Sequence, residues 1–294
     1  MNDIKNDVRK TIQDWIDAEV RAGRSVDETR LNQFIQVVSK RFNNTPRDEF
    51  DGLTPMDMNT IMHKPFSSQC VVELNKLSKE QYEKIPLIRQ ALFLLNTLGE
   101  KELKLTKRGW LPLKIVAETY RLGQPEWIVE EYGAKRYYEY DVLSVYLARI
   151  ILEVLGWTKM RKGVLSLTVK GKKALSNIDS AANEMLNFSL FGGGLHLLDG
   201  NDDNSIGNEG MAYSVWLLGK YGEDWHTGNF YQRHYQNVFD FPDAFNIYET
   251  RVFKHLFYWL GIVEKRRNRE VGPPYENEYK KTELLSMIFS FKKA

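Results

Sequence analysis

A seven-residue pattern occurs twice in the chain, and its two copies begin 62 residues apart. Residues 103–109 are Leu-Lys-Leu-Thr-Lys-Arg-Gly, and residues 165–171 are Leu-Ser-Leu-Thr-Val-Lys-Gly. In both copies the alternate leucines predict a short strand with one apolar face, the threonine can cap a following helix, and the glycine suits a turn. The repeat therefore predicts small modules in which short strands lead into helices.

The residues around the repeat predict a defined series of elements. Apolar spacing and stop residues indicate helices at 86–98, 110–122, 140–155 and 171–177, strands at 102–106, 157–160 and 164–168, and a basic turn at 161–163. Helix, strand, helix, helix and hairpin, in this order, are typical of winged-helix modules of the helix-turn-helix class. In such a module we expect the first strand, 102–106, to pair with the hairpin strand 164–168.

A looser second series follows residue 206. It comprises predicted helices at 211–221, 229–239 and 246–260, then a strand, a basic wing and a second strand over 262–279, and a last helix from Thr282. Pro273 and Pro274 lengthen this second wing. The chain is therefore expected to repeat the same module.

Before these modules, apolar residues at helical spacing predict two amphipathic helices at 3–22 and 28–42. We predict a mainly α protein with small antiparallel sheets, an α+β fold with tandem winged-helix-like modules after an N-terminal helical arm. The expected boundaries are 1–84 for the arm and capped helices, 85–180 for the first module and 181–294 for the second.

Composition limits the cofactors and the compartment. Cys70 is the only cysteine, so this chain alone can form neither an internal disulfide nor a cysteine-based zinc site. The first residues lack the pattern of a signal peptide, and no run of 18 apolar residues occurs. We expect a cytoplasmic protein with no membrane partner, no metal and no cofactor.

The net charge of +2 is small, but it is unevenly distributed. Residues 1–84 carry 13 basic and 14 acidic side chains, residues 85–180 carry 16 and 10, and residues 181–294 carry 12 and 15. The middle segment is therefore the basic one, at +6. Such an excess favours a polyanionic partner, but a cytosolic domain without such a partner is equally able to be a few charges away from neutral.

Basic residues cluster at the two predicted wings and just behind the first. They are Lys159, Arg161, Lys162, Lys170, Lys172 and Lys173 in the first module and Lys265, Arg266, Arg267 and Arg269 in the second. A hairpin tip that projects cations suits contact with nucleic-acid phosphates. The alternative is a solvated turn that binds nothing.

Other candidate sites are weaker. The predicted helix 140–155 offers mainly Asp141, Ser144, Arg149 and Glu153 to solvent, a poor set for reading base edges. Residues 192–210 place Asp199, Asn201 and Asp203 as in a calcium loop, but Asn204 and Gly210 stand where Gly and Glu are required, which favours a flexible loop. Aromatic residues crowd 225–241, and we interpret them as core with structural histidines.

Five segments resemble an uncharacterised bacterial family, some members of which carry a C-terminal SEC-C zinc motif. They are residues 51–66 (Asp-Gly-Leu-Thr-Pro-Met through Lys-Pro-Phe), 85–93, 103–116, 165–171 and 221–225. The resemblance runs from about residue 45 to the end. The SEC-C cysteines are absent here, so it implies no zinc, and it implies no established reaction and no catalytic residue.

No familiar catalytic motif occurs in the sequence, so we expect a non-enzymatic protein. The leading expectation is an intracellular binding protein that contacts DNA or RNA phosphates through its basic wings. The alternative is a protein-interaction or assembly scaffold with a protein partner and no nucleic acid. The sequence does not determine the oligomeric state.

Overall fold

The computed structural model describes residues 2–126, 129–130, 133, 136–191, 195–199, 205–239, 246–268 and 276–292. Over these residues the chain is mainly helical, with small antiparallel sheets, as predicted. The helices are α1 (Asn2–Arg21), α2 (Glu28–Asn43), the 3-10 turn η1 (Asp48–Phe50), α3 (Pro55–His63), α4 (Lys79–Tyr82), α5 (Pro86–Glu100), α6 (Leu113–Tyr120), α8 (Leu143–Val154), α9 (Val169–Leu175), α10 (Ile178–Leu190), α11 (His196–Asp199), α12 (Met211–Tyr221), α13 (Gly228–Gln236), the π-helix η2 (Glu249–Phe257) and α14 (Glu283–Ile288). The strands are β1 (Val72–Leu74), β2 (Leu103–Lys104), β3 (Thr158–Arg161), β4 (Val164–Leu167), β5 (His226–Thr227), β6 (Val263–Arg267), β7 (Asn277–Lys281) and β8 (Phe289–Phe291).

Two of the sheets have the same connectivity. The first has the strand order β2-β4-β3, and the second has the order β5-β7-β6. In each, a two-residue strand that follows a helix pairs with the second strand of a later hairpin. The expected pairing of the two Leu-x-Leu segments is confirmed, because Leu103 lies opposite Leu165 in antiparallel register. Strand β5 was not predicted from the sequence.

The threonines of the two repeats have different roles. The Thr168 hydroxyl accepts a hydrogen bond from the Gly171 amide at 3.0 Å and caps α9, as predicted. Thr106 caps no helix, so that expectation is wrong: its hydroxyl accepts from the Trp110 amide at 3.1 Å and closes a tight turn. The next helix, α6, begins only at Leu113, because Pro112 disfavours helical backbone in the residue before it.

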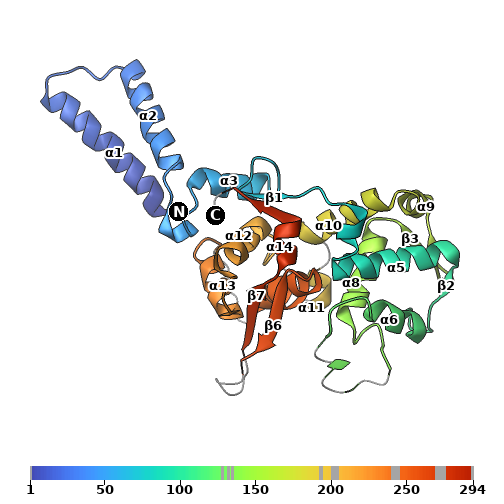
Figure 1. Cartoon of the computed structure of the whole chain (residues 1–294). Coiled ribbons are helices and arrows are strands. Elements are labelled where there is room, and N and C mark those ends of the chain that lie inside the picture. Colours follow the sequence, from blue (N-terminus) through green and yellow to red (C-terminus); the bar gives the residue numbers. More distant parts are fainter. Residues whose placement is uncertain are drawn as a thin grey trace.

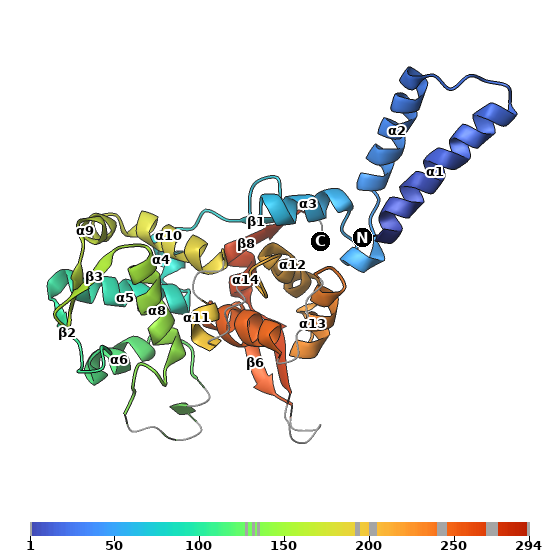
Figure 2. The ribbon, with the colours of Figure 1, turned by 180° about the vertical axis from the view of Figure 1, so that it is seen from behind.

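The third sheet joins distant parts of the chain. Strand β1 pairs with β8, with Val72 opposite Phe291. Figures 1 and 2 show the unit built on α5 and α8 beside the unit built on α12 and α13, with β1 and β8 close to the second unit. Buried apolar side chains from Leu53 to Phe289 form one continuous core cluster. The core therefore begins near Leu53, within the segment 1–84 that we assigned to the arm and capped helices.

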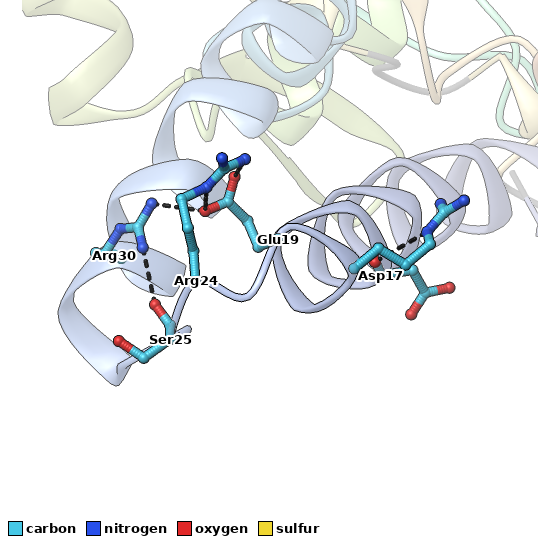
Figure 3. Close-up of polar contacts among 6 residues, drawn as sticks. Asp17, Glu19, Arg24, Ser25 and Arg30 are labelled. Atoms are coloured by element: carbon cyan, nitrogen blue, oxygen red, sulfur yellow. Dashed lines mark hydrogen bonds and ion pairs between the residues drawn. The ribbon is translucent and has the colours of Figure 1, made fainter.

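Helices α1 and α2 form a hairpin that projects from this body (Figures 1 and 2). The Trp15 and Phe34 rings stack between the two helices, with centroids 4.3 Å apart. At the turn, Glu19 accepts hydrogen bonds from Arg24 and Arg30 (Figure 3). The two hydrogen bonds lower the pKa of Glu19 to about 2, and the bond from Arg24 has the largest effect. The hairpin is thus held by its own side chains.

The predicted helix at 246–260 is present, but its central part is wound as a π-helix. Arg251 is buried there, and its guanidinium donates to Asp199 at 2.6 and 3.0 Å and to the Ile206 carbonyl at 3.1 Å.

Among the described residues, no helix is both long and apolar enough to cross a membrane.

Candidate nucleic-acid interface

The β3–β4 hairpin is built around a two-residue turn. Lys162 and Gly163 have φ angles of +51° and +73°, as the two central residues of a type I′ turn require. The Leu105 amide donates to the Gly163 carbonyl at 2.8 Å, so the hairpin tip lies beside the end of β2. The hairpin is therefore held at its tip as well as along its strands.

All six predicted basic residues of the first module are exposed. They are Lys159, Arg161, Lys162, Lys170, Lys172 and Lys173. Within the described part of the chain, none of the six forms an ion pair. The Thr168 hydroxyl donates to the Gly156 carbonyl at 2.8 Å, which places the start of α9 at the base of the hairpin. Unpaired cations thus line the hairpin from its tip to the adjoining helix.

Two of the predicted basic residues of the second module, Lys265 and Arg266, contact other side chains of the chain. Lys265 lies over the Tyr258 ring at 4.0 Å, and burial lowers its pKa to about 8. Arg266 pairs with Glu278 at 2.7 Å and lies over the Trp225 ring at 4.4 Å. Arg267 is half-buried. Arg269 lies outside the described residues. The second hairpin therefore offers less free charge than the first.

Helix α8 stands where a winged-helix module would carry its base-reading helix, and its polar residues are not free. Ser144, expected at the surface, is buried, and its hydroxyl accepts a hydrogen bond from the Gln90 side chain at 3.2 Å. Arg149 keeps only 11% of its side chain exposed and pairs with Glu139 and Glu153, both at 3.1 Å. The expectation of an exposed Ser144 is wrong because α8 packs against α5 on that side.

An aromatic surface that the sequence analysis did not identify adjoins the first hairpin. Trp110 lines two surface hollows of about 450 and 410 Å³. The larger also contains Arg108, Tyr146 and Lys159. The smaller contains Lys107, Arg108, Tyr138 and Tyr140. We call this set the Trp110 surface: Lys107, Arg108, Trp110, Tyr138, Tyr140, Tyr146 and Lys159. The sequence analysis placed Trp110, Tyr140 and Tyr146 in predicted helices and Tyr138 between them, and no local pattern indicates that these rings meet.

Glu139 lies at the edge of this surface and is almost completely buried. Its Oε2 accepts from the Leu111 amide at 2.6 Å and from Arg149 at 3.1 Å. Burial raises the pKa of Glu139 to about 7 and outweighs the opposing effect of Arg149. Its Oε1 is buried and has no hydrogen-bond partner among the described residues.

A second polar cluster surrounds Asp51, which the sequence analysis did not single out. Its carboxylate accepts hydrogen bonds from Tyr213 at 2.5 Å and Tyr221 at 2.6 Å, and it lies 2.8 Å from His234 Nδ1. An aspartate beside a histidine can support proton transfer, but none of the described hollows includes His234. The cluster joins the 48–51 turn to α12 and α13, which is a structural role.

The other weak candidates are now placed. The Asp199 carboxylate is occupied by Arg251, while Asn201 and Asp203 lie outside the described residues. Of the aromatic residues in 225–241, Tyr231 and Tyr235 are fully buried, in agreement with a core role. No group of three His, Cys, Asp or Glu side chains able to hold a metal ion occurs in the part of the chain that the structure describes.

Comparisons with known proteins found no matching family model, no matching curated protein and no matching solved structure. The resemblance to the family with SEC-C members therefore stays a prediction from the sequence.

Proposed function

We propose that the protein is a non-enzymatic nucleic-acid-binding protein, which contacts phosphates through the β3–β4 hairpin and α9 of a winged-helix-like module. The observation that carries this proposal is the set of six exposed cations, none of them in an ion pair within the described chain. Free lysine and arginine side chains on a rigid projection release counterions from nucleic acid when they bind it.

The conformation of Lys162 supports the same function. Its φ of +51° belongs to the left-handed region, which costs a residue with a Cβ about 1–2 kcal/mol and favours Asn or Gly. A lysine at this position sacrifices stability and places a cation at the very tip. Strain of this kind is concentrated at functional sites.

The two modules differ in this function. The repeated strand order supports a winged-helix-like fold for both. However, Lys265 and Arg266 of the second hairpin already contact Tyr258, Trp225 and Glu278. We therefore assign phosphate binding to the first module and a packing role to these two residues.

The test compares two variants with equal loss of charge. Lys159→Gln, Arg161→Gln and Lys162→Asn together remove three charges from the hairpin, while Lys10→Ala, Lys40→Ala and Arg41→Ala remove three from the exposed surface of the arm. Filter binding to a labelled oligonucleotide is measured over a salt series. If all six cations meet phosphates, the slope of log K against log salt is about −4 to −5.

We expect the hairpin variant to flatten that slope by about 2 to 3 and to lose affinity, because fewer counterions are released. The arm variant is expected to bind as the wild type does. Equal losses in both variants would show that only net charge matters, and the site assignment would fail. No retention of DNA or RNA by the wild type at low salt would end the proposal.

A second candidate function is assembly through the arm. Helix α2 has no buried residue, and Val20 and Val37 are 64% and 65% exposed. A second copy of the hairpin would cover both helices in a four-helix arrangement. Sedimentation of the wild type and of Val20→Glu with Val37→Glu tests this: a dimer lost in the variant supports it, and a monomeric wild type contradicts it. A protein that copurifies after nuclease treatment would favour this candidate over the first.

A further inference from the structure

The position of α8 weighs against reading of duplex DNA in the major groove. Such reading needs free polar side chains along the helix that enters the groove. Here Ser144 is buried, and Arg149 is held by the Gly109 carbonyl, Glu139 and Glu153. The polar groups that would meet base edges are thus committed to the protein itself.

The Trp110 surface offers a different kind of contact. The rings of Tyr140 and Tyr146 meet the Trp110 ring at 58° and 72°, with centroids 5.9 and 5.7 Å away. Neither ring is parallel to the indole. The Arg149 guanidinium also lies over the Trp110 ring, 5.9 Å from its centroid, and Trp110 is half-buried. Tyr138 and Tyr140 stack on each other at 16°, and Tyr140 keeps 45% of its surface exposed. A flat ligand can therefore reach the exposed parts of Tyr140 and of the half-buried Trp110 ring.

Cations surround these rings. Lys107, Arg108 and Lys159 are exposed, and Arg108 borders both hollows. Because the Leu105 amide binds the Gly163 carbonyl, the turn that carries Lys107 and Arg108 follows directly from the strand beside the hairpin tip. A nucleic-acid backbone whose phosphates contact the hairpin would thus lead on to the aromatic rings.

Each hollow is lined by one residue with a buried polar atom that has no hydrogen-bond partner within the described chain. These atoms are the hydroxyl of Thr158, which lines the larger hollow, and Oε1 of Glu139, which lines the smaller. Both residues are more than nine-tenths buried. Unsatisfied buried polar groups are uncommon in folded proteins, so both invite a partner at the wall of a hollow.

We propose that the Trp110 surface is a stacking subsite for unpaired bases, so that the ligand of the first module is single-stranded nucleic acid. This inference rests on the proposed phosphate binding and specifies its ligand. Bases stack on Trp110 and Tyr140, while Lys107, Arg108 and Lys159 hold the phosphates on either side. Stacking of this kind tolerates any base, because every base has a π-face.

The experiment uses the full chain and three probes of equal length: a single-stranded oligonucleotide, the same strand in a duplex, and an abasic strand with phosphates but no bases. The variants are Trp110→Leu, which keeps an apolar side chain but loses the ring, and Trp110→Tyr, which keeps a ring. Circular dichroism checks that both variants fold.

We expect Trp110→Leu to weaken binding of the single strand about 5- to 150-fold, since stacking contributes about 1–3 kcal/mol per base. Binding of the abasic strand should not change, and Trp110→Tyr should restore most of the affinity. The wild type should also prefer the single strand to the duplex.

Other outcomes separate the two proposals. If the wild type binds all three probes alike and Trp110→Leu has no effect, the stacking subsite is wrong while phosphate binding stands. If the hairpin variant K159Q/R161Q/K162N binds the abasic strand as well as the wild type does, phosphate binding by the hairpin is wrong. If Trp110→Leu does not fold, tryptophan fluorescence is measured instead. Quenching by the single strand is compared between the wild type and Trp110→Tyr, which lacks the indole at this position. Equal quenching of the two proteins overturns the inference.

Discussion

Burial changes the ionisation of several single residues, in opposite directions for acids and bases. It raises the pKa of Glu139 to about 7 and lowers those of Lys265 to about 8 and His255 to about 3. In each case desolvation disfavours the charged form and is the largest cause. Of these three residues, only Glu139 lies at the proposed interface.

Glu139 makes the stability of the protein depend on pH. Its folded pKa of about 7 lies above the ordinary value of 4.5, so the folded state holds the proton more tightly. The resulting stabilisation is complete below pH 4.5 and is lost as the pH rises through 7. Glu139→Gln mimics the protonated form at every pH. As the pH rises, the free energy of unfolding of this variant should therefore increase relative to that of the wild type, by up to about 3 kcal/mol.

Urea unfolding of the wild type and of Glu139→Gln from pH 5 to about pH 8.5 measures this difference. Glu153→Gln is the control, since Glu153 also pairs with Arg149 but keeps 41% of its side chain exposed. A difference between wild type and Glu139→Gln that stays constant with pH would show that Glu139 is ionised throughout.

At the scale of elements, the two hairpins show how one topology serves two purposes. Both follow the same strand order, and both carry basic residues on the first hairpin strand. The β6 cations meet aromatic rings and Glu278, whereas the β3 cations meet no described partner. What surrounds each hairpin therefore separates a packing element from a candidate interface.

The turn of the first hairpin should show a conflict between stability and binding. Lys162→Asn creates Asn-Gly, the preferred pair for a type I′ turn, and relieves the left-handed lysine. We expect the free energy of unfolding to rise by about 0.5–1 kcal/mol while affinity for oligonucleotides falls.

Urea unfolding and filter binding on the same preparation check both effects. Lys159→Asn in the adjacent strand is the matched control. It removes the same charge from a strand, where asparagine is disfavoured, so it should weaken binding without stabilising the fold. A Lys162→Asn protein of unchanged or lower stability would mean that the turn is not strained.

At the scale of the whole molecule, Asp51 is a joint between the N-terminal segment and the second module. It lies 162 residues before Tyr213 and 170 before Tyr221, and both hydroxyls donate to its carboxylate. The Lys220 ammonium also donates to its backbone carbonyl at 2.5 Å. Together with the β1–β8 pairing, these bonds hold the ends of the body together.

Asp51→Asn should therefore lower the free energy of unfolding by about 2–4 kcal/mol, because an amide cannot accept three donors as a carboxylate does. Asparagine tolerates the left-handed φ of +54° found here, so backbone strain should contribute little. Thermal unfolding measures the loss, with the exposed Asp48→Asn in the same turn as control. Equal stability of the two variants would show that the joint is dispensable.

The sequence by itself determined the local elements next to the repeated pattern and the pairing of the first sheet. Alternate leucines identify the buried face of a strand, and glycine and threonine mark its ends, because these signals depend on neighbours in the chain. For this reason the contact between Leu103 and Leu165, the capping role of Thr168 and the basic hairpin were all predictable. The capping role expected of Thr106 was wrong because Pro112 delays the next helix.

Only the tertiary structure decided which charges are free and which polar groups meet. The sequence shows similar basic runs in both hairpins, yet Trp225 and Tyr258 cover cations of one and no described residue pairs with those of the other. The Trp110 surface and the Asp51 joint are likewise assembled from residues far apart in the chain. Packing of distant segments sets solvent exposure and ion pairing, and no local pattern carries that information.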